Sequence, residues 1–458
     1  MKLDVFDNVK DLLSVNFDHQ PHFVLKIQGE ELFCERILRL IPGRRIVVQG
    51  IWNKQKVVAK LFIDIKRARA QADAEKRGFD ALKKAAIPTP ELLLVTELSM
   101  PGLFTAIYSE IPESTSLHKQ LRTNHPIKNK VFFEKAILLI KKLHDNNLIQ
   151  ADCHLDNVLI QGDELYLIDC KSIVTTALPA EKHDNLILFC AQLSLSEQPL
   201  LDKVMPDALT PDFLEALKQA RIKRATHFLK KTTRTSSQFI SHKNLDRSYT
   251  YQRQYHSKAL LELLNNPEAF LESAEKTIIK NGNSATLFKT WLDDKEVIIK
   301  RYNIKDPWHF ITHSFKTTRA KVSWQYACLL QLFDIPSPAP IAYLETKHAG
   351  LSHTSYFIME NLPGKNLLDY CASAFPQTIF EQTTALIHAI QSLQIAHHDL
   401  KATNFFVSYD RVFLVDLDHM ALINNLQKWQ VAAKADIKRF RRNWVHNPRL
   451  AKAFDEHL

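Results

Sequence analysis

Two aspartates and one asparagine recur with the same spacing in both halves of this chain of 458 residues, and these residue types suit phosphoryl transfer. They are Asp152, Asn157 and Asp169 in the first half and Asp399, Asn404 and Asp416 in the second. In such a reaction one carboxylate orients the attacking hydroxyl and accepts its proton. An amide oxygen and a second carboxylate hold Mg²⁺ on the nucleotide phosphates, because Mg²⁺ prefers hard oxygen ligands. The spacing therefore predicts two related sites for phosphate chemistry.

The elements around these residues would bring them together. The segments VLIQGDELYLID (158–169) and FFVSYDRVFLVD (405–416) each predict two short strands around a tight turn. An antiparallel hairpin returns the chain to its start, so the asparagine before it and the aspartate after it can face one metal ion. Upstream, Lys60 and Lys300 lie in β-branched stretches that predict strands, from which a lysine can bind nucleotide phosphates.

An internal repeat organises the chain. Residues 133–169 align with residues 380–416 at a constant offset of 247 residues, and two Pro-x-Pro segments, 88–90 and 336–338, also correspond. A period of about 250 residues is too long for a solenoid and indicates domain duplication. Within each repeat, strands come first and helices later, which predicts an α+β fold with separate lobes.

The composition is that of an ordinary globular protein, with 45% hydrophobic and 24% charged residues, and the net charge of +10 favours an anionic partner. From Ala216 to Leu245 there is no acidic residue. That stretch is either a solvated helix face or a surface for the phosphates of a nucleotide, an acidic glycolipid or a membrane. No nucleic-acid-binding motif is present, so nucleic acid is not expected as a partner.

The cysteine pattern and the absence of apolar targeting segments indicate the redox state and the compartment of the protein. Six scattered cysteines without a CxxC pair favour reduced thiols over a disulfide framework. No stretch is long and apolar enough for a membrane span, and the start, MKLDVFDNVKDLL, lacks the basic and apolar regions of a secretory signal. We therefore expect a cytoplasmic protein, whose charge is compatible with peripheral contact at the cytoplasmic face of the inner membrane.

The motifs also resemble a known family. The segment HHDLKATNFFV…VFLVDLDHM resembles the catalytic and metal-binding loops of the protein-kinase fold, most of all those of bacterial lipopolysaccharide core kinases, which phosphorylate heptose or Kdo. Residues 280–306 resemble that family's phosphate-loop strand pair and lysine strand. ADCHLDNVLI…LYLIDCKS in the first half is also similar to aminoglycoside-phosphotransferase-like loops. The resemblance implies tandem bilobal kinase-like domains at 1–245 and 273–458, joined by a linker or helical connection at 246–272.

The same resemblance implies ATP and Mg²⁺ as cofactors, and the lipopolysaccharide core or another anionic glycolipid as partner. The implied catalytic bases are Asp152 and Asp399. The implied Mg²⁺ ligands are Asn157, Asp169, Asn404 and Asp416. The implied nucleotide-binding residues are Lys60, Glu75, Glu110, Lys300, Gly282, Ser284 and Glu360, with Glu110 and Glu360 at the hinge between lobes. The residues expected to support the catalytic loops are His154, His397, Lys401, Asp184 and Asp436.

Three departures from the family pattern stand out. Neither half has a GxGxxG phosphate loop, so phosphates would be bound more by side chains such as those of Arg44 and Arg45. Counting back 13 residues from the first proline of each Pro-x-Pro gives Glu75 as the lysine partner in the first half, but Ser323 in the second. Neither half keeps the glycine of the usual Asp-Phe-Gly. Weaker activity of the second half, or a modified arrangement there, is therefore expected.

Residues and resemblance together predict an ATP- and Mg²⁺-dependent transferase that phosphorylates a heptose or Kdo hydroxyl of the lipopolysaccharide core. A small-molecule or protein kinase on the same fold is one alternative, and the absent activation segment disfavours a protein substrate. A pseudokinase scaffold that binds nucleotide or glycolipid without turnover is another. Ser323 and the atypical glycine loops favour the scaffold, whereas retention of the Lys, Asp, Asn and Asp set in both halves disfavours it.

Overall fold

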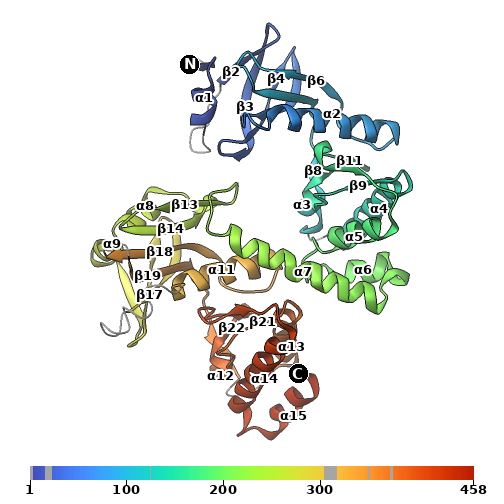
Figure 1. The fold of residues 1–458 in the computed structure, drawn as a ribbon. Coiled ribbons are helices and arrows are strands. Elements are labelled where there is room, and N and C mark those ends of the chain that lie inside the picture. The colour runs from blue at the N-terminus through green and yellow to red at the C-terminus, as the bar shows by residue number, and fades with distance from the viewer. Residues whose placement is uncertain (1–3, 16–22, 124, 304–316, 349–350, 372–374) are drawn as a thin grey trace. The chain divides into compact units, whose positions relative to one another are not determined.

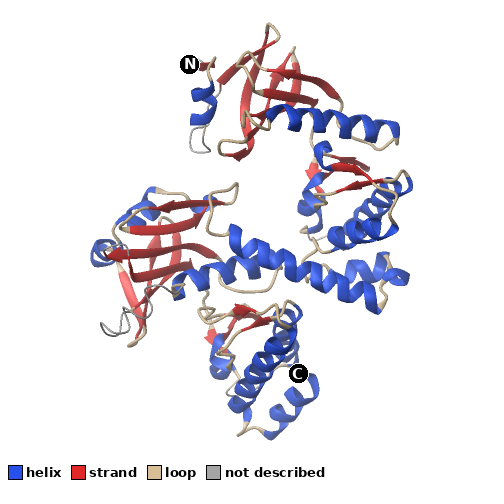
Figure 2. Ribbon diagram, viewed as in Figure 1, coloured by secondary structure: helices blue, strands red, loops and turns tan. Residues whose placement is uncertain are grey.

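The computed structural model describes residues 4–15, 23–123, 125–303, 317–348, 351–371 and 375–458 (Figure 1). The chain forms two compact units, which are considered one at a time: unit 1 comprises residues 1–193 and 197–217, and unit 2 comprises residues 194–196 and 218–458. Both units combine helices and strands (Figure 2), as the predicted α+β class requires. The division near residue 217 comes earlier than the predicted boundary at residue 245, because the helix that ends at Lys231 already packs with the second unit.

Unit 1 begins with a lobe built on one seven-stranded sheet, whose strand order is β1-β2-β3-β4-β5-β7-β6. The lobe contains β1 (Asp4–Phe6), α1 (Val9–Ser14), β2 (Phe23–Ile27), β3 (Glu30–Ile41), β4 (Arg45–Trp52), β5 (Gln55–Phe62), α2 (Ala68–Lys84), β6 (Leu92–Glu97) and β7 (Phe104–Ser109). In β5 the side chains of Val57, Ala59 and Leu61 are buried in the core. Since side chains alternate along a strand, Lys60 points to the opposite face.

The second lobe of unit 1 is mostly helical. Its elements are β8 (Thr115–Ser116), α3 (Leu117–Leu121), α4 (Pro126–Asp145), β9 (Leu148–Gln150), β10 (Val158–Gln161), β11 (Glu164–Leu167), β12 (Ile173–Thr175), α5 (Pro179–Cys190), α6 (Gln198–Val204) and the first part of α7 (Pro211–Lys231). The predicted helical spacing is realised in α4, which buries Phe133, Ile137, Ile140 and Leu143.

Unit 2 has the same plan. Its sheet lobe contains β13 (Phe239–Lys243), β14 (Arg247–Gln252), α8 (Lys258–Asn265), α9 (Pro267–Ser273), β15 (Lys276–Asn281), β16 (Ala285–Leu292), β17 (Lys295–Tyr302), α11 (Arg319–Leu332), β18 (Pro340–His348) and β19 (Leu351–Glu360). The sheet order is β13-β14-β18-β19-β17-β16-β15. Strands β15 to β19 thus have the neighbour order of β3 to β7, while the additional strands join opposite ends of the two sheets. Residues 246–272, predicted as a connection, supply β14 to the sheet and form α8 and α9.

The helical lobe of unit 2 contains the second predicted hairpin. Its elements are β20 (Lys365–Asn366), α12 (Leu367–Tyr370), α13 (Gln377–Ser392), β21 (Ile395–Ala396), β22 (Phe405–Ser408), β23 (Arg411–Leu414), β24 (Ala421–Leu422), α14 (Leu426–Arg441) and α15 (Pro448–His457). Helices α13, α14 and α15 meet in an aromatic core that includes Phe380, Phe440, Trp444 and Phe454. This core fixes α14, whose Asp436 accepts hydrogen bonds from the backbone of His397 and His398.

The internal repeat in the sequence corresponds to a repeat in hydrogen bonding. The hairpins pair Val158 with Leu167 and Phe405 with Leu414, so their registers match at the offset of 247 residues. In both units the Pro-x-Pro carbonyl accepts from the hairpin, with Leu167 N to Pro88 O at 2.8 Å and Leu414 N to Pro336 O at 2.9 Å. In each unit, the segment between the sheet-lobe helix and the next strand is thereby hydrogen-bonded to the hairpin.

Three expectations from composition can be compared with the fold. Within the described residues, no helix is both long and apolar enough to cross a membrane. All six cysteines are free, as predicted. The acid-free stretch is not a uniform exposed surface: Arg221 is buried, and Lys218 and Arg224 lie over the rings of Trp429 and Phe333. Part of its charge therefore serves packing within unit 2.

Candidate active sites

In unit 2 the lysine predicted to bind phosphates contacts two aspartates. Lys300 on β17 donates to Asp416 Oδ1 and, at 3.0 Å, to Asp418 Oδ2. Burial opposes protonation of Lys300, but the neighbouring oxygens of Tyr302, Asp418 and Asp416 raise its pKa above the ordinary lysine value. Burial also acts to raise the pKa of Asp416, yet the nearby Lys300 ammonium lowers it to about 2. Both groups are therefore charged at neutral pH.

Asp418 is a site residue that the sequence reasoning missed. Its side chain is fully buried, and it also accepts from Arg319 Nη2 at 2.7 Å. Ser323, at the usual place of the lysine-partner acid, instead shares a hydrogen bond of 2.8 Å with Tyr302. The acid that pairs with Lys300 has thus moved from the helix to the loop after the hairpin. The repeat contained the signal, because Asp418 aligns with Lys171 at the offset of 247 residues.

The catalytic loop of unit 2 is held from two sides. Asn404 Nδ2 donates to the backbone carbonyl of Asp399 at 2.9 Å. Asp436, on α14, accepts from the backbone N–H groups of His397 and His398 at 2.7 and 3.1 Å. The Asp399 carboxylate itself lies 2.8 Å from Lys401 Nζ. These contacts hold the backbone around Asp399 in one position.

His397 and its counterpart in unit 1 make equivalent contacts. His397 is buried, and its Nε2 lies 3.3 Å from the carbonyl of Val415, the residue before Asp416. In unit 1, Gln150 Nε2 donates to the carbonyl of Ile168, the residue before Asp169, at 2.8 Å. Histidine and glutamine at this position therefore make the same connection, to the residue before Asp416 in unit 2 and before Asp169 in unit 1.

A cleft of about 400 Å³ brings the predicted residues of unit 2 together. Its polar lining comes from Gly282, Ser284, Lys300, Glu360, Asn404 and Asp416. Ala285, Ile298, Phe357, Met359 and Leu417 supply an apolar part that suits a planar base. The predicted phosphate-loop, lysine, hinge and metal-binding residues of this unit therefore line one cavity.

The residues present in unit 2 fit Mg²⁺. The Asn404 amide nitrogen is used in a hydrogen bond, so the amide oxygen is the atom left as a ligand. The Asp416 carboxylate is charged, and 34% of its side chain is exposed. An amide oxygen and an accessible carboxylate are the hard donors that Mg²⁺ prefers. Asp169 and Asp416 share a left-handed backbone conformation, with φ of 65° and 60°, so the two units have the same local geometry at this position.

Unit 1 contains the lysine–glutamate pair that was predicted there. Lys60 Nζ lies 2.7 Å from Glu75 Oε1 and 3.3 Å from Asp169 Oδ1. Glu75 is fully buried, and its second oxygen accepts from the Tyr108 hydroxyl at 2.7 Å. Burial raises the pKa of Tyr108, with the adjacent Glu75 adding to the effect, so this hydroxyl remains a donor. Both carboxylate oxygens of Glu75 are thereby satisfied.

A glycine allows helix α2 to approach this site. A Cβ atom at Gly78 would lie 1.8 Å from the backbone carbonyl oxygen of Cys170, the residue after Asp169. The helix that carries Glu75 is therefore in direct backbone contact with the loop that carries Asp169. In unit 2 the corresponding position holds Tyr326, whose hydroxyl accepts from the backbone N–H of Leu422 at 2.6 Å.

Of the remaining predicted residues of unit 1, Asn157 makes the contact seen in unit 2, whereas Asp184 is exposed. Asn157 Nδ2 donates to the Asp152 carbonyl at 2.8 Å, as in unit 2, and Asp152 is exposed. The Asp184 side chain is 77% exposed and lies near His183, whereas Asn185 donates to the Gln150 carbonyl at 2.7 Å. The support predicted for Asp184 thus comes from the next residue, because α5 turns Asn185 toward the loop.

His154 and Glu110 contact neighbours within unit 1. His154 Nδ1 lies 3.4 Å from Asp156 Oδ2, which also contacts His118. Burial opposes ionisation of Asp156, but the hydrogen bond from His118 and the nearby imidazoles lower its pKa to about 2. Glu110 follows β7 and accepts from Gln49 at 2.9 Å. The sequence did not single out Asp156.

Comparison with known proteins agrees with the geometry of unit 2. Residues 272–453 match the model of the lipopolysaccharide kinase (Kdo/WaaP) family. A comparison with curated proteins gives no match. Among solved structures, the chain is similar to "WaaP in complex with acyl carrier protein", at 16% identity over 40% of this chain and 78% of that chain, with a TM-score of 0.30. The family match confirms the predicted resemblance and the enzyme class, an ATP-dependent phosphotransferase.

Proposed function

From the match of residues 272–453 to the lipopolysaccharide kinase family, we propose that unit 2 transfers the γ-phosphate of ATP to a heptose or Kdo hydroxyl of the lipopolysaccharide core. One observation carries the proposal: Lys300, Asn404 and Asp416 line one cleft, and Asn404 is hydrogen-bonded to Asp399. We also propose that the chain contains two kinase-like domains, of which unit 2 is the catalytic one. The match lies within unit 2, and Asp416 is the more accessible of the two aspartates proposed as metal ligands.

The chemistry follows from the charges of the site. The Asp399 carboxylate accepts the proton of the acceptor hydroxyl, whose oxygen forms a bond to the γ-phosphorus as the bond to the β–γ bridging oxygen breaks and ADP leaves. Lys300, held by Asp416 and Asp418, binds phosphate oxygens of ATP. Asn404 and Asp416 would hold Mg²⁺, which supplies charge neutralisation on the phosphates. Asp436 keeps the catalytic loop in place through two backbone hydrogen bonds.

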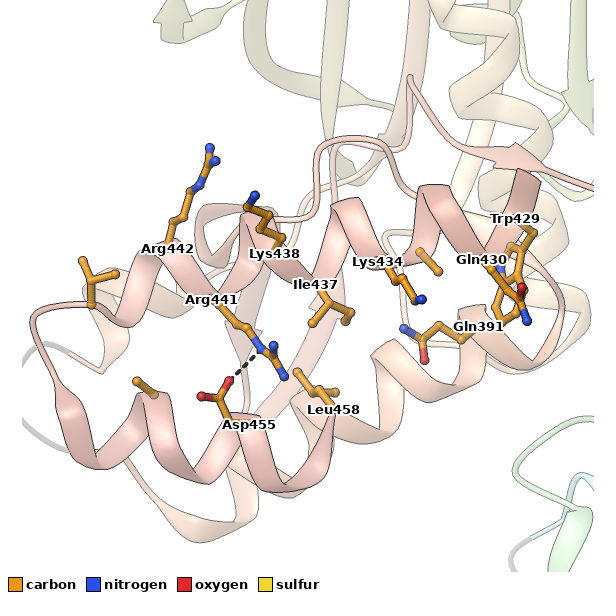
Figure 3. A pocket seen from close by; sticks show the side chains of 13 residues that line it. Gln391, Trp429, Gln430, Lys434, Ile437, Lys438, Arg441, Arg442, Asp455 and Leu458 are labelled. Atoms are coloured by element: carbon orange, nitrogen blue, oxygen red, sulfur yellow. Dashed lines mark ion pairs between the residues drawn. The ribbon is translucent and has the colours of Figure 1, made fainter. Parts of the chain in front are cut away.

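A groove on unit 2 supports contact with an anionic leaflet, where a lipid-anchored acceptor would be found. The groove lies beside α14 and encloses about 820 Å³. Figure 3 shows Lys434 and Lys438 on α14 and Arg442 directly after its end, while Arg441 is paired with Asp455 at 2.7 Å. The first three are exposed and next to apolar side chains such as Val445, which is 63% exposed. We propose that this groove, termed the α14 groove, faces acidic phospholipid headgroups at the inner membrane.

Phosphate transfer to purified core oligosaccharide, followed by mass spectrometry, tests the proposal. We expect Asp399→Asn to abolish transfer and Asp152→Asn, the matched substitution in unit 1, to retain most of it. Loss in Asp152→Asn alone would assign catalysis to unit 1 and overturn the assignment to unit 2. ATP hydrolysis without transfer would retain the kinase and reject the acceptor in favour of a small molecule. Nucleotide binding without hydrolysis or transfer would instead favour a scaffold.

A further inference from the structure

The surroundings of Asp169 in unit 1 correspond to the cleft of unit 2 and are termed the cleft of unit 1. Its cations are Lys60, Arg45 and Lys171, and its buried carboxylates are Glu75 and Asp169. The exposed Asp152 acts on Arg45 more weakly than these two carboxylates. Unit 2 has equal numbers around the same point, with Lys300 and Arg319 against Asp416 and Asp418. Lys60 contacts both Glu75 and Asp169, so the negative charge of Asp169 is balanced jointly by Lys60, Lys171 and Arg45.

Arg45 has donors that the protein does not satisfy. Its side chain is only 5% exposed, and its Nη1 lies 3.7 Å from Asp169 Oδ1. Among the residues that the structure describes, neither Nε nor Nη1 of Arg45 has a hydrogen-bond partner. A buried guanidinium with unused donors is costly, so the arrangement favours an external acceptor such as a phosphate oxygen.

Strand register shows that Arg45 points into the cleft and that unit 2 has no equivalent. Arg45 pairs with Phe62, two residues after Lys60, and therefore lies on the same sheet face as that lysine. In unit 2, Ala285 pairs with Tyr302, two residues after Lys300. The repeat also exchanges Lys171 for Asp418. Both changes make the cleft of unit 1 more positive than that of unit 2.

These charges disfavour a divalent cation at Asp169. The Asp169 side chain is 10% exposed, against 34% for Asp416, and a cation bound to it would lie beside Arg45 and Lys60. Repulsion between cations separated by a few ångströms in a buried cleft is strong. The donor set of unit 1 therefore does not fit Mg²⁺ as that of unit 2 does, although the sequence predicts the same ligands in both.

We propose that the cleft of unit 1 binds the polyphosphate of an anionic ligand without a divalent cation, with Arg45 and Lys171 in the place of the metal. The inference rests on the kinase-like arrangement proposed for unit 1, but not on catalysis by unit 2. Arg45 would donate to the phosphate through its two unused N–H groups, and Lys171 would supply a second positive charge. Unit 1 would thus bind a nucleotide or pyrophosphate that is free of Mg²⁺, whereas unit 2 would use the Mg²⁺ complex of ATP.

Calorimetric titration of the full chain with ATP and with pyrophosphate, each in EDTA and in MgCl₂, tests the proposal. We expect about one equivalent of ATP to bind in EDTA. Arg45→Met should weaken that binding at least tenfold, whereas Arg77→Met, at an exposed arginine of α2, should not. Binding of pyrophosphate as well would show that the polyphosphate suffices, and binding of ATP alone would show that the nucleoside is needed; both results agree with the proposal.

Two further variants test whether ATP binds to unit 1 and not to unit 2. Lys171→Asp, which introduces the residue type of unit 2, should also weaken binding in EDTA at least tenfold, and it removes no fully buried group. Lys300→Met should leave binding in EDTA intact. Absence of binding in EDTA, retention of affinity in both Arg45→Met and Lys171→Asp, or loss in Lys300→Met alone would each overturn the proposal. None of these outcomes bears on phosphate transfer by unit 2.

Discussion

At the scale of single residues, the position of one carboxylate distinguishes the two clefts. Unit 1 pairs its lysine with Glu75 from a helix, and unit 2 pairs its lysine with Asp418 from a loop. Asp418→Asn should reduce kcat/KM for ATP about tenfold to a hundredfold, because Lys300 and Arg319 lose a buried counter-charge. Since Lys300 would bind ATP and not the acceptor, KM for ATP should rise while KM for the acceptor stays constant. Steady-state kinetics with each substrate varied in turn measures the two constants.

A second substitution that restores activity would show that Asp418 positions Lys300, and that its loss does not simply destabilise the protein. Ser323 lines the cleft of unit 2, so a longer side chain there can reach Lys300. The double variant Ser323→Glu with Asp418→Asn should recover part of the lost kcat/KM, because it recreates the lysine partner of unit 1. Ser323→Ala with Asp418→Asn is the matched control and should recover nothing. Equal kinetics of the two double variants would contradict a positioning role for Asp418.

His397 offers a prediction on pH at the same scale. Burial lowers the pKa of His397 below 6.5, although Asp436, Asp416 and Asp399 face the ring and act in the other direction. The unfolded chain therefore takes up a proton near pH 6.5 that the folded chain resists, and folding stability is lost as the pH falls below that value. His397→Gln should flatten the fall, because Gln150 makes the equivalent contact without titrating.

Thermal unfolding of unit 2 between pH 7.5 and 5, followed by tryptophan fluorescence, measures the effect. Five of the six tryptophans follow residue 218, so the signal reports mainly on unit 2. Wild type and His397→Gln should differ in the slope of the unfolding temperature against pH. The corresponding difference in the free energy of unfolding is at most that of one proton, about 1.4 kcal/mol per pH unit. His388→Gln, on α13 and away from the catalytic loop, is the control. Parallel curves for wild type and His397→Gln would reject the assignment.

At the scale of elements, the contact between α2 and the loop of Asp169 depends on one glycine. Alanine is normally favoured over glycine in a helix by about 0.5–1 kcal/mol. Gly78→Ala should nevertheless destabilise unit 1 by about 1–3 kcal/mol, because the added methyl group would meet the backbone carbonyl of Cys170. Amide hydrogen exchange should become faster in residues 169–172 and in α2. Arg77→Ala, on the exposed face of the same helix, should leave exchange unchanged, and a stabilised Gly78→Ala variant would contradict the proposed contact.

At the scale of the whole molecule, the sequence predicted what depends on local pattern and repetition. The hairpins, their equal registers, the lysine strands and the Lys60–Glu75 pair all follow from residue types at fixed spacing. Features that depend on packing between distant segments were not predictable in this way. Asp418 and Asn185 act through contacts made only when a loop or a helix turns a given side chain inward. Arg45 was predicted as a phosphate-binding side chain together with Arg44, but its burial beside Asp169 was not. The alignment of the two halves shows Asp418 in the place of Lys171. The role of Asp418 became clear only from its contact with Lys300 in the structure.

The charge of the whole molecule also bears on where it would act. Each basic residue near an anionic surface contributes about 1 kcal/mol to binding. Reversing Lys434, Lys438 and Arg442 to glutamate should therefore weaken binding to vesicles of phosphatidylglycerol and phosphatidylethanolamine at least tenfold, as measured by sedimentation. Reversing Lys243, Lys258 and Lys365, which are exposed elsewhere on unit 2, changes the net charge equally. If net charge alone directs binding, both triple variants lose the same affinity, whereas the α14 groove requires that only the first does. Raising the salt concentration should reduce the difference between them, because exposed charges are screened.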